Sequence, residues 1–504
     1  MRLRTTPLTA VLSGALILGT SAAVAVPAPA TATAGKSAAG TIDWKQCAGT
    51  TEAIQCATLE VPLDWSKPDG EKIHIGLART QATDSKSRIG SVLMVPGGPG
   101  TSGVDVMIHQ KGKVFTDAVS KRFDVVTYDP RGVNTSSRVK CDLTMTIKTE
   151  RLKTPRSQAD FDELVAANKK LSEDCRAKTG PLYDHLSSRD VVRDIDAIRA
   201  ALGEDKITQV GYSYGTLANQ QYAEMYPNRV RALVADANLV HTMRGPWDWM
   251  NAHTAVQEKN FVAFADWCDQ TSGCALYGKD TKKTYGELRE RARKGDLVDP
   301  NTGGKVDFYA LTDKIFLSNV PDKWTRLANE LKALSDGEKT DAPKQQQTKV
   351  AEDDPLAPLP HGVYFCRDFK FKVNSYAQWK TWLARLAKLY PNTQWTSFAQ
   401  SGLDCTGWVG ETTNPQARPN IKGAPPLVMI GNVHDFAADY PSSQLAAKQT
   451  GATLVTYEGY GHAVYPTTGG AGPVTCINDV IDDYLIDLKV PAKGTSCPDI
   501  ETPK

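Results

Sequence analysis

Short apolar runs recur along the first half of the chain with the length and composition of buried β-strands. They are rich in valine, isoleucine and aromatic residues, and turn-forming residues follow most of them. Runs of this kind lie at residues 73–79, 91–95, 124–129, 207–212 and 232–236. Strands that are apolar on both faces are typical of a sheet with both faces covered.

The segments between these runs carry a helical pattern of apolar positions. The clearest one, residues 187–202, places Val191, Ile195 and Ile198 on one helical face. Ser187 and Asp190 at its start have the spacing of a capping box. Strands that alternate with helices predict an α/β fold, with a mostly parallel sheet and helices on both of its faces.

The pattern changes in the second half of the chain. Residues 241–422 are rich in tryptophan, lysine and helical periodicity, and include a polar stretch at 335–360 that we expect to be an exposed loop. The strand pattern resumes at 425–431 and 452–462. The sequence therefore predicts a sheet core at 40–240 and 423–504 that is interrupted by a helical cap at 241–422. We expect the cap to lie over the carboxyl ends of the strands, where open α/β sheets place their sites.

The N-terminus has the order of a secretory signal peptide. Arg2 and Arg4 precede an apolar stretch at 8–26, and small-residue sites follow it. We predict a signal peptide at 1–34, with a possible short propeptide to about residue 39, and hence an extracellular protein. An uncleaved membrane anchor is the alternative, although the apolar stretch is short for one.

Charge and cysteine content narrow the functional class. The 504 residues are 41% hydrophobic and 23% charged, with a formal net charge of +2 and no basic patch that would suggest nucleic acid or a membrane surface. A small-molecule or peptide substrate fits this balance better. The ten cysteines predict disulfides in an exported protein. The sequence alone leaves their connectivity open, but pairing between neighbours along the chain closes compact loops without crossing.

The segment 210–216, VGYSYGT, contains the strongest chemical motif. Gly211 and Gly215 flank Ser213 between a predicted strand and a predicted helix. This is the context of a nucleophile elbow, in which a sharp turn exposes the serine hydroxyl at the edge of the sheet. The structural alternative is a glycine-rich turn with a serine N-cap.

A serine nucleophile needs a base and an acid, and in this fold they follow it in the order serine, acid, histidine. His462 directly follows the last predicted strand and fits that order. His434 and His361 are less well placed. We therefore predict that His462 is the base.

The acid is predicted from the segment 431–441, GNVHDFAADYP. A histidine and two carboxylates so close together are also common metal ligands, but the serine machinery upstream requires an acid here. Asp435 lies nearer to the strand end than Asp439, which favours Asp435. Asp236, at the end of the preceding strand, is a third position that some hydrolases use.

The glycine-rich segment 95–103, VPGGPGTSG, follows a predicted strand and is the expected oxyanion loop. We predict that the backbone amides of Gly98, with Gly97 nearby, and of Tyr214 form the oxyanion hole. A phosphate-binding loop is excluded because no Gly-Lys-Ser/Thr follows the glycines.

Together these motifs resemble the α/β-hydrolase fold, and more narrowly the secreted tripeptidyl aminopeptidases of actinomycetes, which are relatives of the prolyl aminopeptidases. The resemblance extends to segments 61–70 and 128–137 and to the tail from Cys476 to Cys497. It implies that Ser213 is the nucleophile, His462 the base and Asp435 the acid. It also implies that Asp129 and Arg131 hold the turn beneath the site. The family motif D-P-x-T-P-Y reads DFAADY here, so the acid loop lacks its usual prolines.

The resemblance implies cleavage of peptide bonds near a free N-terminus through an acyl-enzyme, without a metal or organic cofactor. A buried carboxylate would bind the substrate amine, and Glu258, Asp266 and Asp269 are among the candidates. Two alternatives remain open: an esterase with the same triad, and a secreted binding protein on an inactive hydrolase fold. Neither nucleic acid nor, after signal removal, a membrane is an expected partner, and the sequence does not indicate an oligomeric state.

Overall fold

A computed structural model describes residues 42–50, 52–339, 359–467, 472–500 and 502 of the chain. Residues 40–504 form one compact unit. The predicted signal peptide and propeptide lie outside the described residues, as does most of the predicted polar loop.

The described residues form a ten-stranded sheet in the order β1-β2-β3-β5-β4-β6-β7-β8-β9-β10. β1, β2, β3 and β5 pair antiparallel, and every pair from β5 to β10 is parallel. The predicted mostly parallel sheet is confirmed. The strands are β1 (Lys45–Gln46), β2 (Gln55–Pro62), β3 (Lys72–Thr80), β4 (Gly90–Val95), β5 (Phe123–Tyr128), β6 (Ile207–Tyr212), β7 (Val230–Asp236), β8 (Val428–His434), β9 (Thr453–Tyr460) and β10 (Ser496–Cys497).

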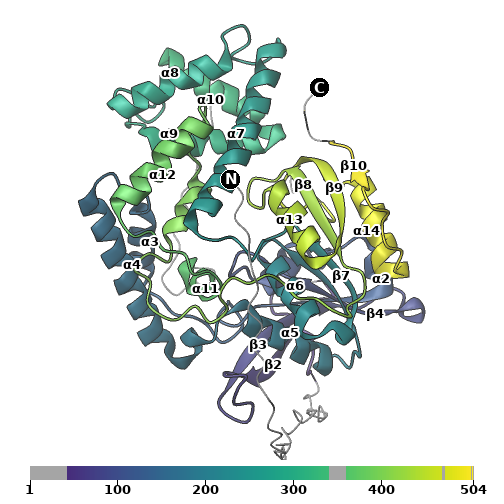
Figure 1. Ribbon diagram of the computed structural model, residues 1–504. Helices are drawn as coiled ribbons and strands as arrows, with labels where there is room; N and C mark the ends of the chain where they lie inside the picture. Colours follow the sequence, from purple (N-terminus) through teal and green to yellow (C-terminus); the bar gives the residue numbers. More distant parts are fainter. Residues whose placement is uncertain (1–41, 51, 340–358, 468–471, 501, 503–504) are drawn as a thin grey trace, which may run out of the picture. The chain divides into compact units, whose positions relative to one another are not determined.

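Helices cover both faces of this sheet, and a separate apolar core lies on each face. One core packs α5 (Ser188–Ala201), α6 (Gly215–Met225) and α13 (Tyr440–Thr450) against the strands. The other packs α1 (Gly103–His109), α2 (Asp117–Arg122) and α14 (Thr475–Asp487) against them. The predicted capping box of α5 is present, because the Ser187 hydroxyl accepts from the Asp190 amide and the Asp190 carboxylate accepts from Ser187. Figure 1 shows this layering.

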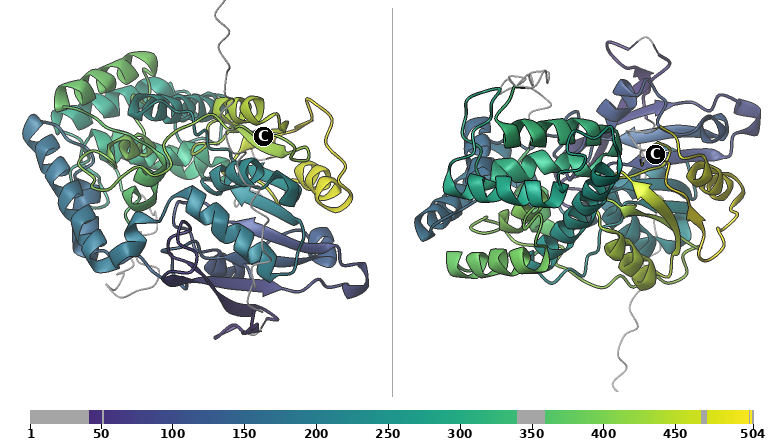
Figure 2. Two further views of the ribbon diagram at one scale, coloured as in Figure 1. Left: turned by 60° about the horizontal axis from the view of Figure 1, so that its bottom comes forward. Right: turned by 90° about the horizontal axis from the view of Figure 1, so that it is seen from above.

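Residues 241–422, which we call the helical insertion, separate β7 from β8. Their helices are α7 (Pro246–Gln270), α8 (Thr281–Lys294), α9 (Phe308–Ile315), α10 (Trp324–Asp336), α11 (Gly362–Asp368) and α12 (Tyr376–Leu389). In Figures 1 and 2 most of these helices form a group beside the sheet. α7 crosses the carboxyl end of β8, where Lys259 Nζ donates to the Val433 carbonyl and Asn260 Nδ2 donates to the His434 carbonyl. The insertion therefore lies at the edge of the sheet where the sequence predicts the site.

The helical layer also includes a part of the chain outside the insertion. α3 (Leu143–Arg151) and α4 (Gln158–Thr179) follow β5, and α4 contacts α12 (Figure 1). Phe161 and Leu164 of α4 join an apolar core with Trp379 and Trp395 of the insertion. Residues that precede Ser213 in the chain thus help to hold the insertion in place.

Five disulfides link the ten cysteines. Each joins neighbours along the chain, and no two cross, which is the compact arrangement considered from the sequence. The pairs are Cys47–Cys56, Cys141–Cys175, Cys268–Cys274, Cys366–Cys405 and Cys476–Cys497.

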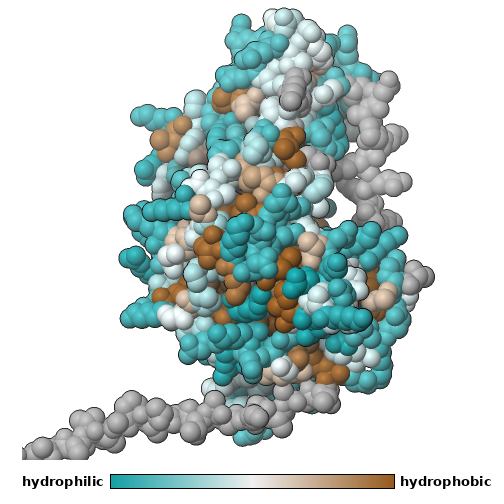
Figure 3. Space-filling view, turned by 90° about the vertical axis from the view of Figure 1, so that its right-hand side faces the viewer, coloured by the Kyte–Doolittle hydropathy of each residue, from teal (hydrophilic) through white to brown (hydrophobic). Residues whose placement is uncertain are grey.

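Large apolar side chains on the surface are scattered along the chain. On the face shown in Figure 3 they form small groups between polar residues. Among the described residues, the exposed large apolar side chains include Ile147, Tyr277, Leu389 and Leu445. Within the described ranges, every helix is too short or too polar to cross a membrane.

Candidate active site

Ser213 lies in the sharp turn between β6 and α6, with a φ of 52°. Its flanking glycines are required by close contacts. A Cβ on Gly211 would lie 2.6 Å from the side chain of Asn219, and one on Gly215 would lie 2.5 Å from the Val95 carbonyl oxygen. The side chain of Ser213 is half-buried. The predicted elbow geometry therefore places a reachable hydroxyl at the start of a helix.

His462 and Asp435 meet at the carboxyl ends of β9 and β8. His462 Nδ1 lies 2.9 Å from Asp435 Oδ1 and 3.1 Å from Oδ2. An ionised carboxylate only accepts hydrogen bonds, so Nδ1 is the donor and Nε2 is left with its lone pair. Asp435 is fully buried, and its Oδ1 also accepts from the amides of Ala437 and Ala438 at 2.9 Å each. The acid is thus fixed by the loop that carries it.

The electrostatics of His462 suit a base. Burial lowers the pKa of His462, but the charge of Asp435 and its hydrogen bond outweigh burial, and Asp236 adds to their effect, so the net pKa is raised. A raised pKa makes the imidazole a stronger base toward a serine proton.

Asp439 has a different role from Asp435. It is the N-cap of α13, where its carboxylate accepts from the Ser442 amide at 3.2 Å and from the Ser442 hydroxyl at 2.6 Å. This explains part of the unusual DFAADY sequence. Where the family motif has a stiffening proline, this chain holds the loop by a helix cap at Asp439 and by the two amide bonds to Asp435.

The side chains of segment 431–441 do not form a metal site. His434 Nδ1 contacts Asn260 Oδ1 at 2.7 Å, and its ring stacks on Tyr460 with centroids 4.0 Å apart. Burial lowers the pKa of His434 to about 4. Across the described residues, no group of three or more histidine, cysteine or acidic side chains has the arrangement of a metal site.

Asp236 connects the serine to the histidine loop. Its backbone carbonyl accepts from the Ser213 amide at 2.9 Å, and its carboxylate accepts from the amides of Val464 and Tyr465 at 2.7 and 2.8 Å. Burial raises the pKa of Asp236 to about 7. Asp236 therefore positions the turn after His462 and does not contact the imidazole as an acid partner would. Within the described part of the chain, the Ser213 hydroxyl itself makes no hydrogen bond; catalytic hydrogen bonds often tighten only when substrate binds.

The loop after β4 lies directly against the elbow. A Cβ on Gly97 would lie 2.7 Å from the Tyr212 carbonyl oxygen and 2.9 Å from Ser213 Cβ. Gly98 has a φ of 105° and is exposed. Among the residues described, the amides of Gly98 and Tyr214 donate to no other group, so both are available to an oxyanion beside Ser213.

The turn beneath the site holds this loop. Asp129 is buried and accepts from the Ser102 hydroxyl at 2.6 Å and from the Val104 amide at 3.1 Å. Arg131 forms a buried ion pair of 2.7 Å with Asp194 on α5. These contacts agree with the structural roles that the family resemblance implies for the two residues.

Asp368 is a residue that the sequence reasoning missed. It ends α11 in the helical insertion, and the Tyr214 hydroxyl donates to its Oδ2 at 2.6 Å. Asp368 Oδ1 also accepts from Ser188 Oγ at 2.9 Å and from Asn414 Nδ2 at 2.7 Å. Burial raises the pKa of Asp368. The insertion is thus tied to the residue directly after the nucleophile. No local motif marks this link, since Tyr214 and Asp368 are 154 residues apart.

The three carboxylates considered for amine binding are already engaged. Glu258 accepts hydrogen bonds from Asn392 and Thr393. Asp266 binds the ammonium group of Lys282, and Asp269 binds Thr281 at the start of α8. The structure therefore gives each of them a structural role and singles out none of them for a substrate amine.

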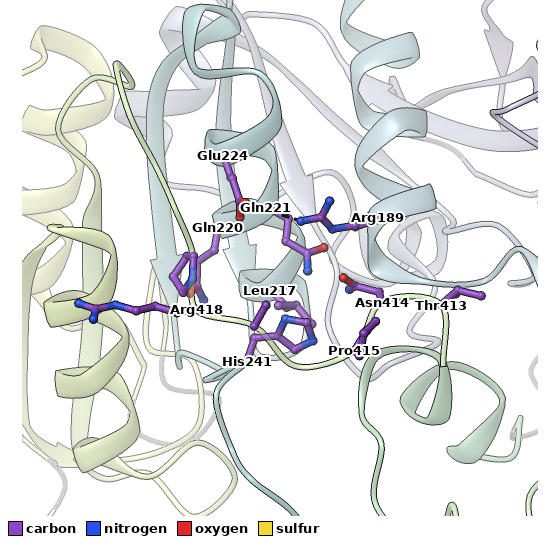
Figure 4. A pocket seen from close by; sticks show the side chains of 12 residues that line it. Arg189, Leu217, Gln220, Gln221, Glu224, His241, Thr413, Asn414, Pro415 and Arg418 are labelled. Carbon is purple, nitrogen blue, oxygen red and sulfur yellow. Dashed lines mark ion pairs between the residues drawn. The ribbon is translucent and has the colours of Figure 1, made fainter. Parts of the chain in front are cut away.

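A separate hollow of about 280 Å³ lies beside α6 and is lined by none of the predicted site residues. Figure 4 shows Arg189, Glu224 and His241 around it. Arg189 and Glu224 form an ion pair of 3.6 Å, and His241 Nε2 contacts the Asp368 carbonyl at 2.8 Å. These three polar side chains of the hollow thus have partners within the protein, and the hollow is distinct from the Ser213 site.

Comparison with known proteins agrees with this geometry. Residues 90–467 match the model of the alpha/beta hydrolase fold family. The chain is similar to a tripeptidyl aminopeptidase of Streptomyces lividans, with 29% identity over 94% of this chain and 89% of that protein. It is also similar to the serine protease Hip1 of Mycobacterium tuberculosis, with 28% identity over 90% of this chain and 91% of that protein. A carboxylesterase B of the same species is 28% identical over 90% of this chain and 89% of that protein. The predicted resemblance is confirmed: this chain belongs to the alpha/beta hydrolase fold family and is similar to the actinomycete tripeptidyl aminopeptidases.

Proposed function

We propose that this protein is a secreted serine peptidase that removes short segments, of three residues by analogy with the name of its relatives, from the free N-termini of peptides.

 The observation that carries this proposal is the His462–Asp435 contact, formed at the strand ends beside the elbow that exposes Ser213. The relatives named as a tripeptidyl aminopeptidase and as a serine protease support the peptidase activity.

The proposed reaction uses each residue at a stated atom. Ser213 Oγ attacks the scissile carbonyl carbon while His462 Nε2 takes its proton, and the Asp435 carboxylate stabilises the imidazolium. The amides of Gly98 and Tyr214 donate to the oxyanion. His462 then gives the proton to the leaving amine as the C–N bond breaks, which leaves an acyl-enzyme on Ser213. Water, deprotonated by His462, releases the N-terminal segment and restores the serine.

The preference for chain ends rests on the helical insertion. α7 contacts the end of β8, and Asp368 of α11 binds Tyr214, which supports a cap that partly covers the site. A covered site admits the end of a peptide more easily than a folded loop. The division into a sheet core at 40–240 and 423–504 and a cap at 241–422 is part of this proposal.

Export is part of the proposal as well. Five disulfides suit an oxidising compartment, and the signal-like segment at 1–34 would direct the chain there. Mass spectrometry of the protein secreted by its own host would test this. A mature N-terminus between residues 34 and 40 is expected, and an intact N-terminus would contradict export with cleavage.

The peptidase activity is tested with p-nitroanilides of di-, tri- and tetrapeptides, each with a free and with an acetylated N-terminus. We expect release of p-nitroaniline to be fastest from the free tripeptide and to fall at least tenfold on acetylation, because the amine then loses its charge. Equal rates for free and blocked substrates would overturn the exopeptidase proposal.

An esterase is the second candidate, and the similarity to a protein named carboxylesterase B favours considering it. The same triad and oxyanion hole serve acyl esters. Activity on p-nitrophenyl butyrate together with none on any peptide anilide would select this function.

A further inference from the structure

Three half-buried phenylalanines pack together beside the histidine of the proposed triad. Phe316 lies in the 3-10 helix Phe316–Asn319, Phe398 lies in the 3-10 helix Ser397–Leu403, and Phe436 directly follows the acid Asp435. The ring centroids of Phe316 and Phe436 are 4.9 Å apart, and those of Phe398 and Phe436 are 5.7 Å apart. The Phe436 ring lies 5.8 Å from the ring of His462. We call these three residues the aromatic wall.

A buried histidine packs against the aromatic wall. The ring of His253 on α7 stacks on Phe398, with centroids 5.6 Å apart. His253 Nε2 contacts the Ala437 carbonyl at 3.1 Å, and Nδ1 contacts the Trp249 carbonyl at 2.8 Å. The wall is therefore fixed both to the insertion and to the acid loop, as a preformed apolar surface should be.

The aromatic wall lies beside the imidazole that protonates the leaving group in the proposed reaction. His462 Nδ1 is occupied by Asp435, so Nε2 is the atom that must deliver a proton to the leaving amine. The residue that follows the scissile bond carries this amine, and its side chain must pass close to the imidazole. The apolar ring of Phe436 lies 5.8 Å from the imidazole ring, close enough for such a side chain to contact it.

We propose that the aromatic wall is a subsite for an apolar side chain on the residue that follows the scissile bond. This inference rests on the proposed peptidase function and adds a substrate preference to it. Burial of apolar surface against the three rings would favour leucine or phenylalanine over glycine at this position.

The alternative is that the three rings only stabilise the acid loop. Phe436 belongs to that loop, so its substitution would not separate the two roles. Phe316 is the better probe, because it lies in the insertion, outside the acid loop, and its ring packs on Phe436 and Phe398. Phe308 is a matched control: it is also half-buried in the insertion, but its ring packs on Arg293 and Tyr309.

The test measures kcat/KM for three tetrapeptide amides that share three alanines and end in glycine, leucine or phenylalanine amide, with the cleaved bond located by mass spectrometry. We expect the natural protein to favour phenylalanine over glycine by about tenfold or more, within the range that apolar pockets achieve. Phe316→Ala should reduce this ratio several-fold with little change for the glycine substrate, and Phe308→Ala should leave it unchanged.

Equal rates on all three amides in the natural protein would overturn the inference, as would an equal loss on all three in Phe316→Ala, which would assign the rings to the stability of the loop. Failure of the proposed function has a different signature. In that case none of the amides would be cleaved, whereas acyl esters would be hydrolysed or no substrate would react.

Discussion

The elbow and the helical insertion differ in how their residues come to the site. The elbow is marked by a local sequence pattern: Gly211 and Gly215 flank Ser213 and permit the close approach of Asn219 and of the Val95 carbonyl. The insertion reaches the site through distant pairs, such as Tyr214 with Asp368 and Lys259 with the carbonyl of Val433, which are 154 and 174 residues apart. The candidate catalytic residues are therefore marked by local motifs, although folding brings them together, whereas no local motif marks the contacts of the insertion.

The largest expected effect concerns the acid of the triad. Asp435→Asn should lower kcat by roughly 10⁴-fold, because loss of the orienting carboxylate leaves the imidazole in the wrong tautomer. Steady-state kinetics on the best peptide anilide measures it.

Asp439→Asn is the matched control for that substitution. Asparagine is as good an N-cap as aspartate, so both kcat and stability should stay close to those of the natural protein. A large loss of kcat in Asp439→Asn with little loss in Asp435→Asn would transfer the acid role to Asp439.

The next effect concerns the hydrogen bond between Tyr214 of the elbow and Asp368 of the insertion. Tyr214→Phe removes a hydrogen bond to the buried Asp368 and should lower the free energy of unfolding by about 1.5–3 kcal/mol. Urea unfolding should show a lower midpoint with an unchanged slope. Tyr440→Phe, which breaks a bond between two neutral hydroxyls, that of Tyr440 and that of Thr456, should have a smaller effect, of about 1 kcal/mol. No difference between the two variants would show that the elbow and the insertion are not joined energetically through Asp368.

A smaller effect is expected in the pH dependence of the rate. The charge of Asp236 raises the pKa of His462. Its effect is smaller than that of burial, which lowers this pKa, and than that of Asp435, which raises it. Asp236 is itself partly protonated near pH 7, so Asp236→Asn removes only the contribution of its ionised form. The pKa of His462 should fall slightly, and its neutral, proton-accepting form should persist to somewhat lower pH. The acid limb of the kcat/KM profile should therefore move to lower pH; a move to higher pH would contradict the assignment.

The same substitution also changes the pH dependence of stability. Burial raises the pKa of Asp236 from 3.8 to about 7, so the folded state binds more protons than the unfolded state between these values. This carboxyl therefore contributes stability that is fully present below about pH 4 and is lost as the pH rises toward 7. Asp236→Asn should flatten the fall of the unfolding free energy over this interval. An unchanged pH dependence would show that Asp236 ionises normally.

Much of the sheet and the candidate triad could be predicted from the sequence, because their signals are local. The runs that became β3 to β9 consist mostly of apolar and β-branched residues, and Ser213 and His462 each follow one of them. β2 was missed because Glu60 and Pro62 interrupt its apolar pattern. β8 runs on to His434, beyond the predicted end of its apolar run, because α7 binds the carbonyls at its end.

The parts that could not be predicted depend on side chains that meet only in the folded chain. Asp368 has no motif around it, and its role follows from contacts with Tyr214 and Ser188. Phe436 stood out only as a departure from the family motif. Its place in the aromatic wall depends on Phe316 and Phe398, which lie far from it in sequence.

We propose that Ser213 is a nucleophile activated by His462. The most direct measurement is the mass of the intact protein after reaction with a fluorophosphonate, with the modified peptide identified by mass spectrometry. The account predicts one adduct on Ser213, with labelling lost in Ser213→Ala and strongly slowed in His462→Ala. Absence of an adduct on the folded protein, or an adduct on another residue, would contradict it and would support a binding protein on an inactive hydrolase fold.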